Sequence, residues 1–124
     1  MNVVLDTNAL MMPVECNVRL FDEVERLVGK PTYLVPEAVV AELEKLADGS
    51  GTEATAASVG LDLLARCEQR ETEHTYADDA VIELTYTVDA EYVVTNDRPL
   101  KERLHAEGVS VISLRGGTKL GINN

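Results

Sequence analysis

Val3-Val4-Leu5-Asp6, a short apolar run that ends in a carboxylate, is the stretch that decides the fold. Three aliphatic residues in a row, without polar alternation, are typical of a strand buried on both faces, as strands are in parallel sheets. Ligands bind beyond the carboxyl ends of such strands. We therefore expect the functional site to lie just past this strand.

Working outward from this strand, apolar strand-like runs alternate with segments of helical periodicity. Further strands are expected at residues 33–35, 91–95 and 109–114, with a weakly extended segment at 72–76. Helices are expected at residues 17–28, 36–46, 53–69, 78–88 and 96–107. This alternation predicts an α/β three-layer sandwich with a central parallel sheet. A length of 124 residues fits one domain spanning residues 1–124.

The chain is strongly acidic, with 22 Asp and Glu against 11 Lys and Arg and a net charge of −11. Such a molecule repels nucleic acid and anionic membranes unless a cation or a basic patch intervenes. No apolar run reaches the length of a membrane helix and no basic leader precedes the first strand, so we expect a cytoplasmic protein without a membrane partner. The acidic bias is typical of a halophilic proteome, and an ordinary acidic surface explains it equally well.

Carboxylates stand out at four further positions in this pattern. Asp97 follows the apolar run of residues 91–95, as Asp6 follows the first strand. Asp78 and Asp79 begin a helix, where the helix dipole favours anions. Glu42 lies on an expected helix and, taken alone, is explained by solvation. Asp6 and Asp97 are the strongest candidates because both end a buried strand.

Taken together, four short motifs resemble the PIN-domain ribonucleases. They are Leu5-Asp6-Thr7-Asn8, Val39-Val40-Ala41-Glu42-Leu43, Asp79-Ala80-Val81-Ile82 and Val94-Thr95-Asn96-Asp97. The resemblance implies a metal-dependent endoribonuclease that leaves 5′-phosphate and 3′-hydroxyl ends. Matched position by position, it gives the four catalytic acids as Asp6, Glu42, Asp79 and Asp97.

Carboxylates gathered in one place repel one another unless a cation neutralises them. A hard divalent ion with oxygen ligands fits, so one or two Mg²⁺ or Mn²⁺ ions are the expected cofactors. Asp78 is expected to cap its helix or to reach the metal through water. The polar residues expected to support the carboxylates are Thr7, Asn8, Thr95 and Asn96.

The basic residues gather near the end of the chain, where residues 98–124 carry a charge of +3 and residues 1–97 carry −14. Arg98 and Lys101 begin the helix after Asp97, and helix N-termini favour phosphates. Arg115 opens a glycine-containing segment, residues 115–119, that could present backbone donors or simply be a terminal loop. We therefore predict RNA binding by Arg98, Lys101 and Arg115.

Several functions remain open on this evidence. The motifs favour an endoribonuclease of ribosomal-RNA processing, partnered by a ribosome-assembly protein, and the alternative within the nucleases is a VapC-like toxin partnered by an antitoxin. From other classes come a receiver-like domain, which lacks its expected lysine here, and a PIN-like metal-binding module without turnover. RNA is the expected substrate, and a homodimer is a further alternative.

Overall fold

The computed structural model describes residues 1–123, in which six strands form one sheet in the order β3-β2-β1-β4-β5-β6. The strands are β1 (Asn2–Leu5), β2 (Thr32–Pro36), β3 (Glu68–Arg70), β4 (Tyr92–Val94), β5 (Ser110–Gly116) and β6 (Lys119–Asn123). The helices are α1 (Thr7–Glu15), α2 (Leu20–Val28), α3 (Glu37–Ala47), α4 (Gly51–Leu63), α5 (Ala77–Thr87) and α6 (Arg98–Ala106), with a 3₁₀ turn at Leu64–Arg66.

The first strand lies at the centre of the sheet, between β2 and β4, and is parallel to both. β3 and β5 extend the parallel sheet outward, and β6 pairs with β5 in the antiparallel sense. Val3, Val4 and Leu5 are fully buried, as expected for a strand covered on both faces. The predicted α/β class with a central parallel sheet is confirmed.

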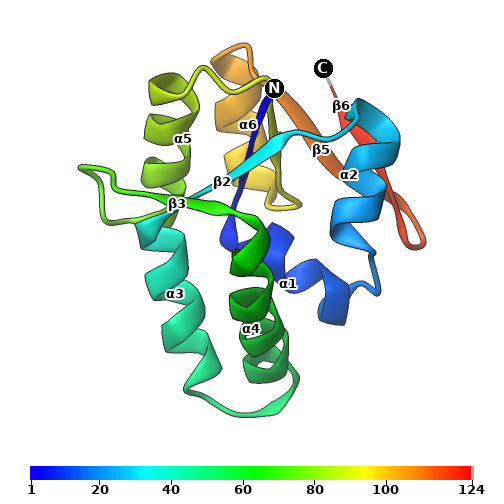
Figure 1. Ribbon diagram of the computed structural model, residues 1–124, viewed down its shortest axis with the longest axis vertical. Coiled ribbons are helices and arrows are strands. Elements are labelled where there is room, and N and C mark those ends of the chain that lie inside the picture. Colours follow the sequence, from blue (N-terminus) through cyan, green and yellow to red (C-terminus); the bar gives the residue numbers. More distant parts are fainter. Residues whose placement is uncertain (124) are drawn as a thin grey trace.

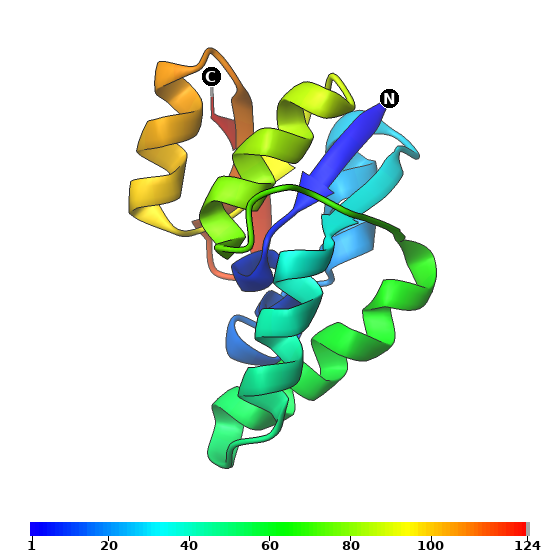
Figure 2. The same cartoon turned by 90° about the vertical axis from the view of Figure 1, so that its left-hand side faces the viewer.

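Helices cover both faces of this sheet and also extend below it. In Figure 2, α5 and α6 lie to one side of β1 and α2 lies to the other. The α3 and α4 helices project beyond the carboxyl ends of the parallel strands (Figure 1). This hairpin packs against α1, and the approach is close at Gly60, where an added Cβ would lie 3.0 Å from the Leu10 carbonyl oxygen. The carboxyl ends of the strands therefore face a space walled by helices.

Three segments differ from the sequence-based expectations. Residues 7–15 form α1, which the sequence did not indicate because Pro13 interrupts the pattern and four successive residues, 9–12, are buried. The weakly extended segment expected at 72–76 forms no strand. The strand lies earlier, at Glu68–Arg70 (β3), and its three residues are polar and exposed and so leave no apolar signal. The helix expected at 53–69 ends at Leu63.

The carboxyl-terminal segment is a β-hairpin rather than a loop. Residues 115–119 span the end of β5, the turn at residues 117–118 and the start of β6, with positive φ angles at Gly116 and Gly117 that glycine adopts without strain. Of the two alternatives for this segment, a terminal loop or a flexible cradle of backbone donors, the structure shows neither, because these residues belong to the strands and their turn. The pairing of β6 with β5 depends on contacts distant in sequence, which local patterns do not reveal.

Candidate functional site

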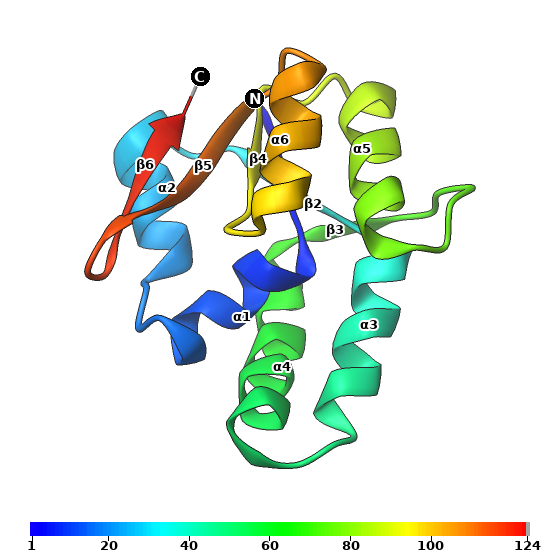
Figure 3. The same cartoon turned by 180° about the vertical axis from the view of Figure 1, so that it is seen from behind.

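Four elements bring their polar residues to one hollow beyond the carboxyl ends of β1 and β4. Asp6 and Asp97 are the N-caps of α1 and α6, Asp78 lies in the first turn of α5, and Glu42 lies midway along α3. Figure 3 shows the first turns of α1, α5 and α6 converging near the upper part of α3. The hollow measures about 440 Å³ and is lined by Asp6, Thr7, Asn8, Met11, Glu15, Glu42, Leu46, Glu53, Tyr76, Asp78 and Asp97.

Asp6 is the most deeply buried carboxylate of this hollow, with only 4% of its surface exposed. Its Oδ1 accepts a hydrogen bond from the backbone N–H of Ala9 at 2.7 Å, so it caps α1. The pKa of Asp6 is raised to about 7, chiefly by burial. The hydrogen bonds from Thr95 and Ala9 lower it, and the charges of Asp78 and Asp97 contribute to the rise. Ionising Asp6 without a cation is therefore costly.

Polar residues of the neighbouring loops hold this arrangement in place. The Thr95 hydroxyl donates to Asp6 Oδ2 and accepts from the backbone N–H of Asp97 at 3.0 Å. The Asn8 side chain accepts from the Asn96 N–H at 2.8 Å, and the Asn96 side chain accepts from the Leu114 N–H at 2.9 Å. The two asparagines thus clamp the ends of β1, β4 and β5 together, and Thr95 links the two aspartates.

Asp78 and Asp97 face Asp6 across the hollow. Partial burial raises the pKa of Asp78, and the nearby charges of Asp97 and Glu42 add to the effect. Asp97 makes no side-chain hydrogen bond to the helix that it precedes, so its carboxylate does not cap α6. Two of the three aspartates therefore have raised pKa values for which the other acids of the same hollow are partly responsible.

Asp79, the expected third acid, does not line this hollow. Its Oδ1 lies 2.9 Å from the Arg103 guanidinium, an ion pair that ties α5 to α6, and more than a third of its side chain is exposed. Successive helical residues point about 100° apart, so only one of Asp78 and Asp79 can face the hollow. The structure departs from the expected register by one residue and brings Asp78 to the other acids.

Two further carboxylates of the hollow, Glu15 and Glu53, were not expected from the sequence. Glu15 ends α1, a helix that the sequence did not indicate, and Glu53 lies in the first turn of α4. Both are exposed, as is Glu42. Their only sequence signal was negative charge, which 22 residues share. Only the packing of α1 against α3 and α4 turns them toward the aspartates.

A family model described as "PIN like domain" matches residues 3–117, which is nearly the whole chain. The chain belongs to the PIN-like domain family. No curated protein sequence matches it.

Three solved structures resemble this PIN-like domain closely in fold. The PIN domain endonuclease Utp24 is 27% identical with a TM-score of 0.80, over 98% of this chain and 90% of that one. VapBC2 from Rickettsia felis, bound to a DNA fragment from its promoter, is 17% identical with a TM-score of 0.69, over 93% of this chain and 100% of that one. A domain of a functionally unknown protein from Methanocaldococcus jannaschii DSM 2661 is also 17% identical with a TM-score of 0.69, over 93% and 91%. The Utp24 match supports a nuclease function for the PIN-like domain, and the two matches at 17% identity show the fold.

The three basic residues expected to bind RNA do not line the acidic hollow. Arg98 is 87% exposed and lies 3.5 Å from Glu102 on its own helix. Arg115 donates to the Ile122 carbonyl at 2.7 Å, so it braces the β5–β6 hairpin. Lys101 is partly buried in the first half of α6. The positive charges of these residues lie on α6 and β5, outside the hollow.

Apart from the Met11 sulfur, the side-chain donors around the hollow are oxygen atoms, the ligands that hard divalent ions prefer. Thr7 lines the same hollow, and its hydroxyl oxygen is buried without a hydrogen-bond partner among residues 1–123. Within residues 1–123, no group of three or more His, Cys, Asp or Glu already lies close enough together to hold a metal ion. By donor type and by its unpaired hydroxyl, the PIN-like domain fits Mg²⁺ or Mn²⁺ better than a softer metal.

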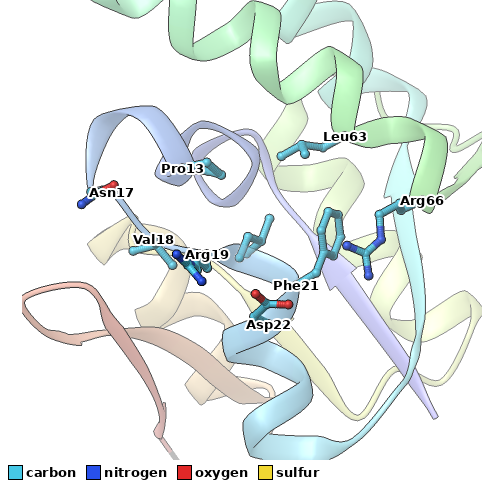
Figure 4. A pocket seen from close by; sticks show the side chains of 9 residues that line it. Pro13, Asn17, Val18, Arg19, Phe21, Asp22, Leu63 and Arg66 are labelled. Carbon is cyan, nitrogen blue, oxygen red and sulfur yellow. The ribbon is translucent and has the colours of Figure 1, made fainter.

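A separate hollow of about 330 Å³ lies between α1, α2 and α4 (Figure 4). Its lining mixes apolar and polar side chains, and the Arg66 guanidinium packs 4.1 Å above the centre of the Phe21 ring. None of the acids expected from the sequence lines it. We therefore place the candidate site of the PIN-like domain in the acidic hollow.

In the described residues, no helix has the length and apolar character needed to span a membrane.

Proposed function

We propose that this PIN-like domain is a metal-dependent endoribonuclease that hydrolyses RNA phosphodiester bonds at the acidic hollow. The observation that carries the proposal is the convergence of Asp6, Asp78 and Asp97 beyond the carboxyl ends of β1 and β4, with Glu42 on the facing helix. The raised pKa values of Asp6 and Asp78 support a cation as the missing partner. The 27% identity to a PIN domain endonuclease supports the reaction class.

In this proposal Asp6, Asp78 and Asp97 hold one or two Mg²⁺ or Mn²⁺ ions, with Glu42 binding directly or through water. When bound, such an ion supplies positive charge and a more acidic water for attack on phosphorus. Ala9 and Thr95 fix the Asp6 carboxylate, Thr95 also fixes the start of α6, and the Thr7 hydroxyl is free to accept or donate a hydrogen bond. These contacts pre-organise the Asp6 carboxylate. Because no three acids of residues 1–123 already lie close enough together to share an ion, metal binding would draw the other carboxylates toward Asp6.

Metal titration tests this proposal directly. Purified protein should cleave RNA in Mn²⁺ or Mg²⁺, lose cleavage in excess chelator, and recover it when the ion is restored. Asp6→Asn should abolish cleavage with the fold retained, whereas Asp62→Asn, which removes the same charge from an exposed position of α4, should not. Cleavage that persists unchanged in chelator, or in Asp6→Asn, would overturn the proposal.

Within the nucleases, we favour an RNA-processing role, with a ribosome-assembly protein as candidate partner, over a toxin neutralised by an antitoxin. The preference rests on Tyr76-Ala77-Asp78-Asp79 and on residues 95–104, which resemble the RNA-processing group more than the toxins. The 27% identity to the PIN domain endonuclease Utp24 supports an endonuclease, whereas the 17% identity to VapBC2 supports the fold alone. Expression of the intact chain without any partner should therefore leave host growth unchanged. Growth arrest that depends on Asp6 would favour the toxin.

A further inference from the structure

Tyr76 places an exposed aromatic ring at the rim of the acidic hollow. It immediately precedes α5, two residues before Asp78, and 65% of its surface is exposed. Its hydroxyl makes no hydrogen bond within residues 1–123, and its side chain does not cap the helix. Phe21 and Tyr33, in contrast, are buried and pack edge to face at 4.7 Å. Packing and capping therefore do not account for the Tyr76 ring.

A second hollow of about 340 Å³ adjoins the acidic one at Tyr76. The two share Tyr76, Glu42 and Leu46 in their linings. The second hollow is otherwise walled mainly by small side chains, Ala38 and Ala41 on α3 and Ala77 on α5. An aromatic ring beside small, apolar side chains offers a surface on which a planar group can stack. The shared residues make it continuous with the proposed cleavage site.

Lys45 supplies positive charge at this second hollow. Among the described residues it is the one cationic side chain that lines either hollow. It is exposed and makes no ion pair with residues 1–123. On a domain with a net charge of −11, an unpaired lysine beside the carboxylates marks a favourable path for a phosphate backbone.

We infer that the hollow between Tyr76 and α3 is a nucleobase subsite, in which one unpaired base of the RNA stacks on the Tyr76 ring. This inference rests on the proposed function. With the base in this subsite, the neighbouring phosphate reaches the acidic hollow and Lys45 contacts the next phosphate along the strand. A base within a duplex is already stacked and paired, so the substrate is RNA that is single-stranded at the cleavage point.

Binding measurements separate this subsite from catalysis. The probe is a short, fluorescently labelled single strand of RNA, titrated with protein in chelator so that cleavage does not interfere. Stacking on one base predicts that Tyr76→Ala weakens binding roughly 5- to 100-fold. Tyr76→Phe should bind like the wild type because the ring remains. Tyr86→Ala is the matched control, since Tyr86 is 59% exposed near the other end of the same helix.

An abasic scan identifies the base that the ring contacts. Removing the base at one position of the strand should weaken wild-type binding as much as Tyr76→Ala does. On that abasic strand the wild type and Tyr76→Ala should bind equally. Lys45→Ala should weaken binding of the intact strand and of the abasic strand by the same factor, and it should make binding less dependent on salt concentration. The duplex form of the RNA should bind without any dependence on Tyr76.

The outcomes distinguish this inference from the proposed function. Tyr76→Ala binding that equals wild-type binding, or a loss that no single abasic position removes, would overturn the base subsite even if metal-dependent cleavage is present. Cleavage that is unchanged in excess chelator would overturn the proposed function. In that case, base-dependent binding through Tyr76 would still support the subsite. Circular dichroism spectra that match the wild type establish that the variants are folded.

Discussion

The Thr95 hydroxyl bridges Asp6 and the backbone of Asp97, because it donates to the Asp6 carboxylate while accepting the Asp97 N–H at 3.0 Å. Asp6 and Thr95 are 89 residues apart in sequence and lie at the ends of two adjacent parallel strands. A hydroxyl has a single proton to donate, and here that proton serves the carboxylate. The ionisation of Asp6 and the start of α6 are thus coupled through one side chain.

We predict that Thr95→Val raises the pKa of Asp6 above about 7, because the hydrogen bond from Thr95 favours the ionised carboxylate. The free energy of unfolding should also fall by about 1–3 kcal/mol in this variant, because the Asp97 N–H loses its hydrogen-bond partner. Carboxyl carbon NMR titration of metal-free protein measures the pKa. Thr95→Ser keeps the hydroxyl and should leave the pKa unchanged. An Asp6 pKa that is the same in Thr95→Val would contradict the coupling.

Asp6→Asn should stabilise the metal-free protein at neutral pH. The pKa of Asp6 is about 7 in the folded chain and 3.8 in an ordinary aspartate. At a pH between these two values, folding is therefore accompanied by the uptake of a proton. The wild type therefore loses stability as pH rises from about 4 to 7, and the variant lacks this loss. In thermal unfolding with chelator, the melting temperature of Asp6→Asn should exceed that of the wild type by a difference that widens over this pH range and then levels off. A constant gap would argue against a buried, protonated Asp6.

Asp78 and Asp79 are expected to differ sharply in function. Asp78→Asn should remove most metal-dependent cleavage, because Asp78 lines the acidic hollow. Asp79→Asn should keep near wild-type cleavage at saturating Mn²⁺ and lose only the exposed ion pair with Arg103, worth about 0.2–1 kcal/mol of stability. The two changes are chemically identical on adjacent residues, so each is the control for the other. Inactive Asp79→Asn beside active Asp78→Asn would restore the register expected from the sequence.

Glu23→Gln should weaken the attachment of the β5–β6 hairpin to α2. The Glu23 carboxylate accepts from the Leu120 N–H at 2.9 Å and pairs with Arg26 at 2.9 Å, and Arg26 donates to the Leu120 carbonyl at 2.8 Å. The outer edge of β6 is thus covered by an ion pair. We expect a loss of about 1–3 kcal/mol in the free energy of unfolding at neutral pH.

The acid response of Glu23 gives a second measurement. Hydrogen bonds from Arg26 and Leu120 lower its pKa to about 2 from 4.5, so its contribution is complete above about 4.5 and is lost as pH falls toward 2. Denaturant unfolding across this range should show a shallower acid slope for Glu23→Gln. Asp22→Asn, an exposed change on the same helix turn, is the control. Equal slopes for Glu23→Gln and the wild type would contradict this role.

Salt dependence tests the halophilic interpretation of the acidic surface. With a net charge of −11, self-repulsion is relieved by screening, so we expect a higher melting temperature in molar KCl than in dilute buffer. Sodium chloride at the same ionic strength should act similarly, which separates screening from specific K⁺ binding. Equal or greater stability in dilute buffer would favour an ordinary acidic surface.

The sequence by itself determined the α/β class, because the buried run at residues 3–5 and the helical periodicities depend only on local patterns. It also indicated Asp6 and Asp97, since a carboxylate directly after a buried strand is a local signal. Only the tertiary structure decided which of Asp78 and Asp79 faces the hollow, because one residue of helical register turns a side chain by about 100°. Tertiary packing likewise formed α1 despite Pro13 and paired β6 with β5. These features depend on contacts between residues far apart in the chain, and no local pattern records such contacts.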